Sequence, residues 1–204
     1  SWNQLGQNIH GENNSDESGW ATAMNGKGDI VVIGSRKNDD GGNDSGHVRV
    51  YQYNDVSWNQ MGYDISGDGS EDKFGYSTAI NKNGNIIAAG GVYFDGGSNA
   101  GGGDNHGYVQ IYEWNKDNET WNKLGNDIVG YKHEDYAGQS VSLSTDGYII
   151  AISHRGQQHG DKGRLTAYKW DGTTWIRLGD DQQMKDINNN NEGVTAGDHI
   201  LKTA

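Results

Sequence analysis

The segment "GYSTAINKNGNIIAAGG" (residues 75–91) places an Asn-Gly pair between two short runs rich in apolar residues. Asn-Gly and Asp-Gly pairs between such runs are the strongest local signal for a β-hairpin, because both central residues of the tight turn need a positive φ. Two similar segments are "GWATAMNGKGDIVVIGS" (residues 19–35) and "GQSVSLSTDGYIIAISH" (residues 138–154). The sequence therefore predicts the same hairpin three times.

Two shorter segments follow each hairpin. The first alternates apolar and polar residues, as a strand does, and occurs as "GHVRVYQYN" (46–54), "GYVQIYEWN" (107–115) and "GRLTAYKWD" (163–171). The second, the Trp motif, has a Trp, then Leu or Met three residues later, then Gly. Its copies are "SWNQLGQNI" (1–9), "SWNQMGYDI" (57–65), "TWNKLGNDI" (120–128) and "TWIRLGDD" (174–181). Each period of about 55 residues thus reads as four strands, A to D.

A four-stranded antiparallel unit repeated in tandem is the expected form of a β-propeller blade. We therefore expect an all-β fold of β-propeller-like blades, each with four antiparallel strands: about three blades plus an extra N-terminal strand. The boundaries are an orphan D strand at 1–9, blade repeats at 10–65, 66–128 and 129–179, and a divergent tail at 180–204. Three blades do not close a ring, since closed propellers have at least about four.

Composition narrows the class of protein. The chain has few aliphatic residues, which by itself permits disorder, but its 7 Trp and 11 Tyr recur at regular places and favour a packed core. A net charge of −12 disfavours nucleic acid and anionic membrane surfaces as partners. No apolar run approaches the ~20 residues of a membrane span, so no membrane insertion is expected. Without Cys the chain has no disulfide, no thiolate metal site and no cysteine nucleophile.

The Trp motif, the hairpin segment "SVSLSTDG" (140–147) and "SGHVRVY" (45–51) together resemble the tandem repeats of marine microbial, algal and viral surface proteins. These repeats are distant relatives of the FG-GAP repeats of integrin α-type β-propellers. The resemblance covers residues 1–179 and implies a propeller fold, outside the cell or at a cell or virion surface. Calcium-binding FG-GAP repeats carry a D-x-D-x-D-G loop between strands A and B. The corresponding turns at 25–28, 81–84 and 144–147 lack these carboxylates, so that calcium site is not carried over.

One loop nevertheless suggests calcium. The long segment between strands B and C of the first repeat holds Asp39, Asp40 and Asp44, and calcium prefers several oxygen ligands from a flexible loop. The alternative is a solvated turn, since loops rich in Gly, Asn and Asp are usually only that. The seven His form no spaced pair with a third zinc ligand, and no nucleophile elbow or phosphate loop is present. We therefore predict no catalytic residue and no other cofactor.

Each predicted strand A is preceded by an acidic pair with an Asp three residues before a Gly: Asp16, Asp72 and Asp135. These carboxylates either form a cation-binding ring at one end of the propeller or accept N–H bonds from their own turns. We favour the second interpretation. Similarly, the Trp residues of the Trp motif are predicted to pack between blades rather than to stack on sugars.

The first Trp motif supplies a D strand with no strands A to C before it. Its Trp2, Leu5 and Ile9 form the expected assembly strand, which would complete the sheet of a neighbouring copy by strand addition. Such a head-to-tail contact gives a ring or a filament. The other possibility is that the missing strands belong to the same polypeptide, outside these residues. Sequons at Asn13, Asn43 and Asn118 are compatible with N-glycosylation of a secreted protein.

The leading hypothesis is a non-enzymatic extracellular or surface protein with a structural or adhesive role, which self-assembles by strand addition and blade stacking. The alternative is a glycan- or protein-binding propeller module of a larger polypeptide. A carbohydrate-active enzyme is the third hypothesis, and it needs a carboxylate pair that breaks the repeat and faces a cleft.

Overall fold

The computed structural model describes residues 1–95, 105–156 and 163–179, so the predicted tail at 180–204 lies outside the described residues. The described part is all-β. Its strands are β1 (Ser18–Met24), β2 (Ile30–Ser35), β3 (His47–Tyr53), β4 (Trp58–Gln60), β5 (Ile65–Ser66), β6 (Phe74–Ile80), β7 (Ile86–Gly91), β8 (Tyr108–Asn115), β9 (Thr120–Lys123), β10 (Ile128–Val129), β11 (Ala137–Leu143), β12 (Ile149–His154), β13 (Arg164–Trp170) and β14 (Trp175–Leu178). Within these described ranges, no helix has the length and apolar character needed to span a membrane.

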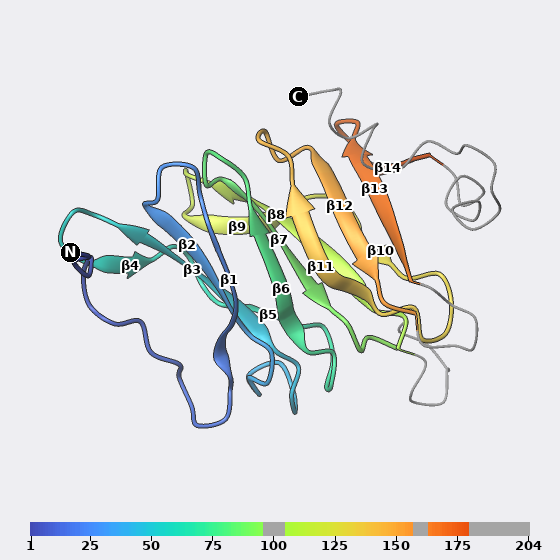
Figure 1. Cartoon of the computed structure of the whole chain (residues 1–204), viewed down its shortest axis with the longest axis horizontal. Helices are drawn as coiled ribbons and strands as arrows, with labels where there is room; N and C mark the ends of the chain where they lie inside the picture. The colour runs from blue at the N-terminus through green and yellow to red at the C-terminus, as the bar shows by residue number, and fades with distance from the viewer. Residues whose placement is uncertain (96–104, 157–162, 180–204) are drawn as a thin grey trace.

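The strands form three antiparallel sheets whose strand order follows the chain (Figure 1). Blade 1 is β1-β2-β3-β4, with β5 also paired to β3. Blade 2 is β6-β7-β8-β9, with β10 also paired to β8, and blade 3 is β11-β12-β13-β14. The predicted strands A to D are thus confirmed in all three repeats.

A side-chain oxygen holds each turn between strands A and B. Asn25 Oδ1 accepts from the backbone N–H groups of Gly28 and Ile30 at 2.9 and 3.1 Å. Asn81 Oδ1 does the same for Ile86 in blade 2 at 3.1 Å. In blade 3 the hydroxyl oxygen of Ser144 takes this role for the N–H of Ile149. The predicted hairpins are therefore stabilised by the residue that precedes each turn, as well as by its Gly.

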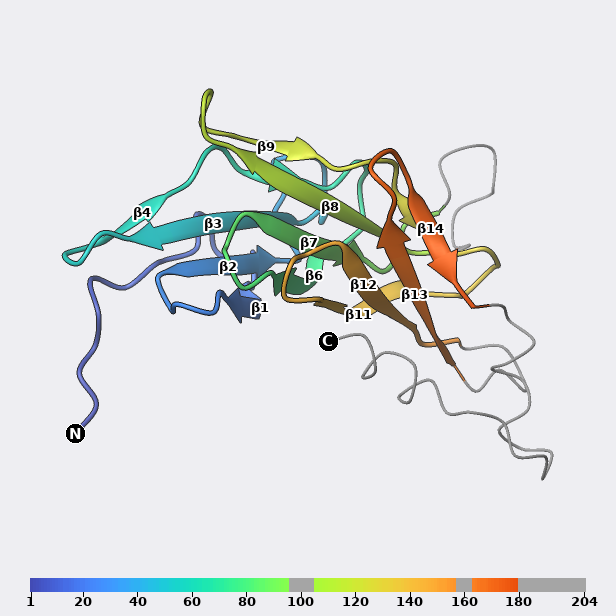
Figure 2. The same ribbon diagram turned by 90° about the horizontal axis from the view of Figure 1, so that it is seen from above.

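The three blades lie side by side with their A strands adjacent, since β6 contacts both β1 and β11. In Figure 2, β3, β8 and β13 point in successively rotated directions, as blades around an axis do. Neighbouring backbones touch where β2 meets β6: a side chain built on Gly34 would lie 2.1 Å from the carbonyl oxygen of Gly75. The equivalent contact joins blades 2 and 3, with 2.3 Å between a side chain built on Gly90 and the Gly138 carbonyl oxygen. Glycine is therefore required on the B strand at both of these junctions.

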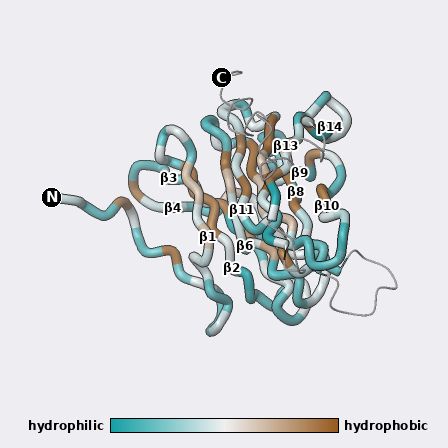
Figure 3. Tube along the Cα trace, turned by 45° about the vertical axis from the view of Figure 1, so that its right-hand side comes forward, coloured by the Kyte–Doolittle hydropathy of each residue, from teal (hydrophilic) through white to brown (hydrophobic). Residues whose placement is uncertain are grey.

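Two hydrophobic clusters fill the spaces between the sheets. The cluster between blades 1 and 2 includes Val32, Val48, Phe74 and Tyr108, and the cluster between blades 2 and 3 includes Ile111. Figure 3 shows hydrophobic positions along the strands and mostly hydrophilic loops at their ends. Each inter-blade space thus has its own core, as expected of stacked sheets whose two faces are both covered.

The predicted extra N-terminal strand is not formed. Residues 1–17 contain no strand, and Trp2 is fully exposed. The physical reason is that a strand needs a partner, and no described segment occupies the C-strand position beside residues 1–9. The sequence motif is correct, but its secondary structure depends on strands that the described residues do not supply.

Candidate functional site

The turns before the A strands contain buried carboxylates. Oδ2 of Asp16 accepts from the N–H of Asn13 at 3.1 Å, and Oδ2 of Asp72 accepts from the N–H of Gly69 at 2.9 Å. In blade 3, Asp135 accepts from the N–H of Tyr131 in the same way at 3.2 Å. All three Asp residues are buried. This confirms that they stabilise their own turns and excludes an exposed ring of these carboxylates.

In blade 2 the polar side chains beside this turn are all paired. The N–H of Asp68 donates to the hydroxyl oxygen of Tyr108 at 3.3 Å, and Gln110 Nε2 donates to Asp68 Oδ2 at 2.7 Å. The hydroxyl of Tyr112 donates in turn to Gln110 Oε1 at 2.7 Å. Tyr108 and Gln110 are thus both bound to Asp68, and Tyr112 is bound to Gln110.

Blade 3 has an Asp–His–hydroxyl chain at the same place. His154 Nδ1 lies 3.0 Å from Asp135 Oδ2, and His154 Nε2 lies 2.8 Å from the hydroxyl oxygen of Thr166. Arg164 also donates to Asp135. This order resembles that of a nucleophile triad, but Thr166 is only 2% exposed. A nucleophile must reach its substrate, so this chain is structural.

Blade 1 departs from this pattern. Its counterpart of Tyr108 and Arg164 is His47, whose ring is completely buried and has no hydrogen-bond partner on either nitrogen. Nδ1 lies 3.5 Å from Asp64 Oδ2 and 3.7 Å from Glu12 Oε2, beyond the usual range of an N–H···O bond.

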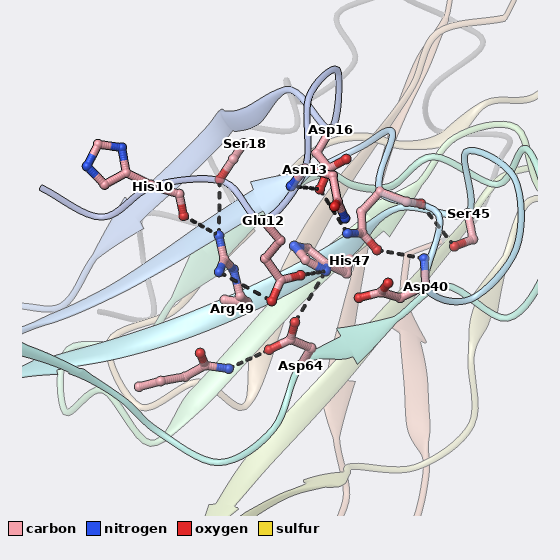
Figure 4. Close-up of polar contacts among 12 residues, drawn as sticks. His10, Glu12, Asn13, Asp16, Ser18, Asp40, Ser45, His47, Arg49 and Asp64 are labelled. Atoms are coloured by element: carbon pink, nitrogen blue, oxygen red, sulfur yellow. Dashed lines mark hydrogen bonds and ion pairs between the residues drawn. The ribbon is translucent and has the colours of Figure 1, made fainter.

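Asp40 completes the group around His47. One ligand atom from each of the four side chains lies within 4.8 Å of the others (Figure 4). No other such group of His, Asp and Glu occurs in the part of the chain that the structure describes. We call these four residues the His47 cluster.

Four separate segments position the His47 cluster. Glu12 belongs to the N-terminal coil, Asp40 to the loop between β2 and β3, and Asp64 to the turn between β4 and β5. His47 is the first residue of β3 and pairs with Ser35 of β2. The other carboxylate oxygen of Asp64 accepts from the side chain of Gln60, which orients it.

The electrostatics of the cluster follow from burial and crowded charge. Burial lowers the pKa of His47, against the opposing effect of the Asp64 charge. Burial, followed by the Asp64 charge, raises the pKa of Glu12. Arg49 partly compensates the negative charge, because its Nη1 lies 3.7 Å from Glu12 Oε1. Burial thus favours the neutral form of the His47 imidazole, and the carboxylates beside it repel one another.

The predicted calcium residues are not brought together. Asp39 Oδ1 accepts from the N–H of Asp44 at 2.8 Å and so closes the loop, while the Asp44 carboxylate pairs with Lys73. Of the three, only Asp40 belongs to a group of side chains that could hold a metal ion together. The sequence analysis missed a difference between the repeats. In the three strand C segments, the residue after the first Gly is His47 in blade 1 but Tyr108 and Arg164 in blades 2 and 3.

The three sequon residues are exposed, so the structure leaves them accessible. They are Asn13, Asn43 and Asn118. The Asn43 side chain donates to Glu71. Glycosylation stays a prediction.

The blade junctions repeat one contact of the Trp motif. Nε1 of Trp121 donates to the Met61 carbonyl oxygen at 3.0 Å, and Nε1 of Trp175 donates to the Leu124 carbonyl oxygen at 2.8 Å. The Gly that follows each acceptor lies against an aromatic pair of the next blade. These pairs are Trp114–Trp121 for Gly62 and Trp170–Trp175 for Gly125. The predicted packing of Trp between blades is confirmed for these junctions.

The N-terminal Trp motif makes the same contact with blade 1, although it forms no strand. Nε1 of Trp58 donates to the Leu5 carbonyl oxygen at 2.9 Å, and a side chain on Gly6 would lie 2.9 Å from the Trp58 ring. The Gln7 side chain also exchanges two hydrogen bonds with the Trp58 backbone. The segment therefore docks as the end of a preceding blade would, with Trp2 as the exception that remains exposed.

The last Trp motif is open among the described residues. Leu178 and Gly179 correspond to Leu5 and Gly6, but a side chain built on Gly179 meets nothing within 4 Å. Ile176 and Leu178 of β14 are exposed beside it. Blade 3 thus presents the acceptor half of a blade junction.

Comparison with known proteins supports the fold alone. No protein-family model and no curated protein matches the chain. Its structure is similar to that of Sqt1 from Saccharomyces cerevisiae, with a TM-score of 0.50 and 10% identity over 81% of this chain and 36% of that one. For hydrazine synthase from Kuenenia stuttgartiensis the values are 0.48 and 10%, over 84% and 38%. The chain thus spans little more than a third of either protein. Together with the three antiparallel sheets, the likeness to Sqt1 confirms the expected β-propeller-like fold.

Asp72 is expected to make the protein less stable as the pH rises from about 4 to about 7. Burial raises the pKa of its carboxyl to about 7 from an ordinary value of 3.8, although the N–H of Gly69 acts in the opposite direction. Between these values the folded state keeps a proton that the unfolded state has lost. Each rise in pH therefore favours unfolding until the folded-state pKa is passed.

The variant Asp72→Asn keeps an oxygen acceptor for Gly69 and is expected to lose this pH dependence. The free energy of unfolding that wild type loses relative to Asp72→Asn is on the order of 3 kcal/mol between about pH 4.5 and pH 8. Urea unfolding at several pH values measures it, with the exposed Asp117→Asn as the control that keeps the wild-type slope. If the free energy of unfolding changed with pH in the same way in wild type and in Asp72→Asn, Asp72 would not be the source of the pH dependence.

Proposed function

We propose that this chain is a non-enzymatic structural or adhesive module, extracellular or on a cell or virion surface, which associates with copies of itself by stacking blade on blade. The observation that supports this is the unit of Leu178 and Gly179, where, among the described residues, a side chain built on the Gly meets nothing within 4 Å. It ends a series of junctions that all use the same Trp-to-carbonyl bond and the same Gly contact. Because Leu178 and Gly179 repeat the acceptor residues of the internal blade junctions, they are suited to bind the same kind of aromatic pair.

A second copy carries that partner. Its Tyr53–Trp58 pair rests on its own Gly6, which is held by a segment that pairs with no strand. If this pair leaves Gly6 of its own copy and packs on Gly179 of a neighbouring copy, it loses one contact with a Trp motif and gains an equivalent one. Such exchange is a low-cost route to association, and a head-to-tail contact generates a ring or a filament.

The junction between copies is expected to be looser than those within the chain. Blade 3 has Ser153 where blades 1 and 2 have Gly34 and Gly90, the residues that let the next backbone approach. A Ser side chain at that place keeps the neighbouring backbone at a greater distance. We therefore expect concentration-dependent association, and a tighter one for Ser153→Gly.

Sedimentation velocity over a range of concentrations, followed by electron microscopy, tests the proposal. Wild type is expected to form species larger than the 22.2 kDa monomer. Gly179→Val fills the place of the incoming aromatic pair and is expected to remain monomeric. Gly172→Val is the matched control, because Gly172 also has a positive φ and no atom near its Cβ position.

A stable monomer at all concentrations would contradict self-association. The chain would then be better explained as a glycan- or protein-binding module within a larger propeller. Equal association of the Gly179→Val and Gly172→Val variants would also contradict the proposed surface, although association itself would remain.

A further inference from the structure

The two distances from His47 Nδ1 to carboxylates of the cluster are close to those of groups that share one ion. His47 Nδ1 lies 3.5 Å from the Asp64 carboxylate and 3.7 Å from the Glu12 carboxylate, too far for good hydrogen bonds. Two ligands of one tetrahedral metal ion, each about 2.0–2.2 Å from it, lie about 3.4 Å apart. The cluster therefore needs little movement to coordinate a cation at its centre.

The buried His47 ring gives a second and independent reason. A buried polar group without a partner costs about 1–3 kcal/mol, and native structures rarely leave one. Both ring nitrogens of His47 are without a partner, and the ring is completely buried with Nδ1 facing two carboxylates. A metal ion at Nδ1 would supply the missing interaction on that side.

The charges in and beside the cluster also match a divalent ion. Glu12, Asp40 and Asp64 contribute three negative charges when ionised, and Arg49 contributes one positive charge beside Glu12. The excess is then two negative charges. A divalent cation removes this excess and relieves the repulsion among the carboxylates.

The other blades show that the arrangement is particular to blade 1. At the position of His47 they have Tyr108 and Arg164, and both of these side chains are paired with protein groups. At the position of Glu12 they have Asp68 and Tyr131. All three blades thus have side chains at the positions of His47 and Glu12, but only blade 1 has this combination of residues there.

We infer that the His47 cluster binds a divalent transition-metal ion of the Zn²⁺ or Mn²⁺ kind through one imidazole and up to three carboxylates. The imidazole distinguishes this site from a calcium site, which takes oxygen ligands only. A bound ion fastens the N-terminal coil to blade 1, because Glu12 is the ligand from that coil. The inference does not depend on self-association.

Isothermal titration of the EDTA-treated protein with Zn²⁺, Mn²⁺ and Ca²⁺ tests the site. One equivalent of Zn²⁺ is expected to bind, and Ca²⁺ more weakly by a factor of about ten or more. Glu12→Gln and Asp40→Asn alter exposed side chains, so the fold is retained, and each is expected to weaken Zn²⁺ binding at least about tenfold. Asp117→Asn makes the same chemical change on another blade and is expected to leave affinity unchanged.

Two further measurements connect binding to the named groups. Zn²⁺ is expected to shift the ring-nitrogen NMR signals of His47 and to slow proteolysis of residues 1–17. Zn²⁺ binding of equal strength in Glu12→Gln, Asp40→Asn and wild type would overturn the inference. Unshifted His47 signals at saturation, or tighter binding of Ca²⁺ than of Zn²⁺, would overturn it as well.

Discussion

Replacing Gly34 by alanine is expected to lower the free energy of unfolding by about 3 kcal/mol, because an added methyl group over-packs the junction between blades 1 and 2. The new Cβ would lie 2.1 Å from the Gly75 carbonyl oxygen and 2.9 Å from its carbon. These are backbone atoms at the end of a paired strand, so no side-chain rotation removes the overlap. The sheets must separate locally, which weakens the cluster around Val32.

Urea unfolding monitored by Trp fluorescence measures this loss. Gly90→Ala is expected to behave alike at the next junction, where the Gly138 carbonyl oxygen would lie 2.3 Å away. Gly69→Ala is the control, since its Cβ would make only ordinary contacts of 3.5 Å with Asp72, and its effect is expected within about 0.5 kcal/mol. A Gly34→Ala protein as stable as that control would show that the blades do not approach so closely.

The sequence predicted the blades because the decisive signals are local. Each A–B hairpin depends on a turn a few residues long, with Asn25, Asn81 or Ser144 before it, and each of these side chains accepts an N–H from its own turn. The Asp residues before the A strands likewise accept an N–H from their own turns. Short-range hydrogen bonds of this kind depend little on the rest of the fold.

The N-terminal segment was predicted less well because a strand is not a local property. Residues 1–9 have the motif of β4 and β9, and the Leu5 carbonyl oxygen accepts from Trp58 Nε1 as the Met61 and Leu124 carbonyl oxygens do from Trp121 and Trp175. Without a neighbouring C strand the segment docks but does not form a ladder. A motif can therefore specify contacts correctly and secondary structure incorrectly.

The candidate metal site could not be predicted because its ligands come from four separate segments. Sequence spacing groups Asp40 with Asp39 and Asp44, whereas the fold groups it with His47 and Glu12. The useful signal was one repeat position that differs between blades: His47 in blade 1, Tyr108 in blade 2 and Arg164 in blade 3. Residues that recur in every repeat are explained by the fold, so residues that differ from the repeat pattern are the candidates for a functional site.

Replacing Phe74 by alanine tests whether stability depends on the packing around each residue or on matching the residue found at the same position of another repeat. Phe74 is completely buried, its ring stacks on Tyr108 with centroids 5.7 Å apart, and it belongs to the cluster between blades 1 and 2. Truncation removes this contact and leaves a cavity, so we expect a loss of about 4 kcal/mol. The corresponding residue of blade 3 is Ala137, which is also fully buried.

An argument from the repeats alone predicts that Phe74→Ala is harmless, because it installs the residue that blade 3 uses. An argument from packing predicts a large loss, because each inter-blade space is filled by its own set of side chains. Urea unfolding distinguishes the two, with the exposed Val56→Ala as a control expected within about 0.5 kcal/mol of wild type. A loss below about 1 kcal/mol would mean that the blade junction closes around the smaller residue, contrary to the limited relaxation seen in most cores.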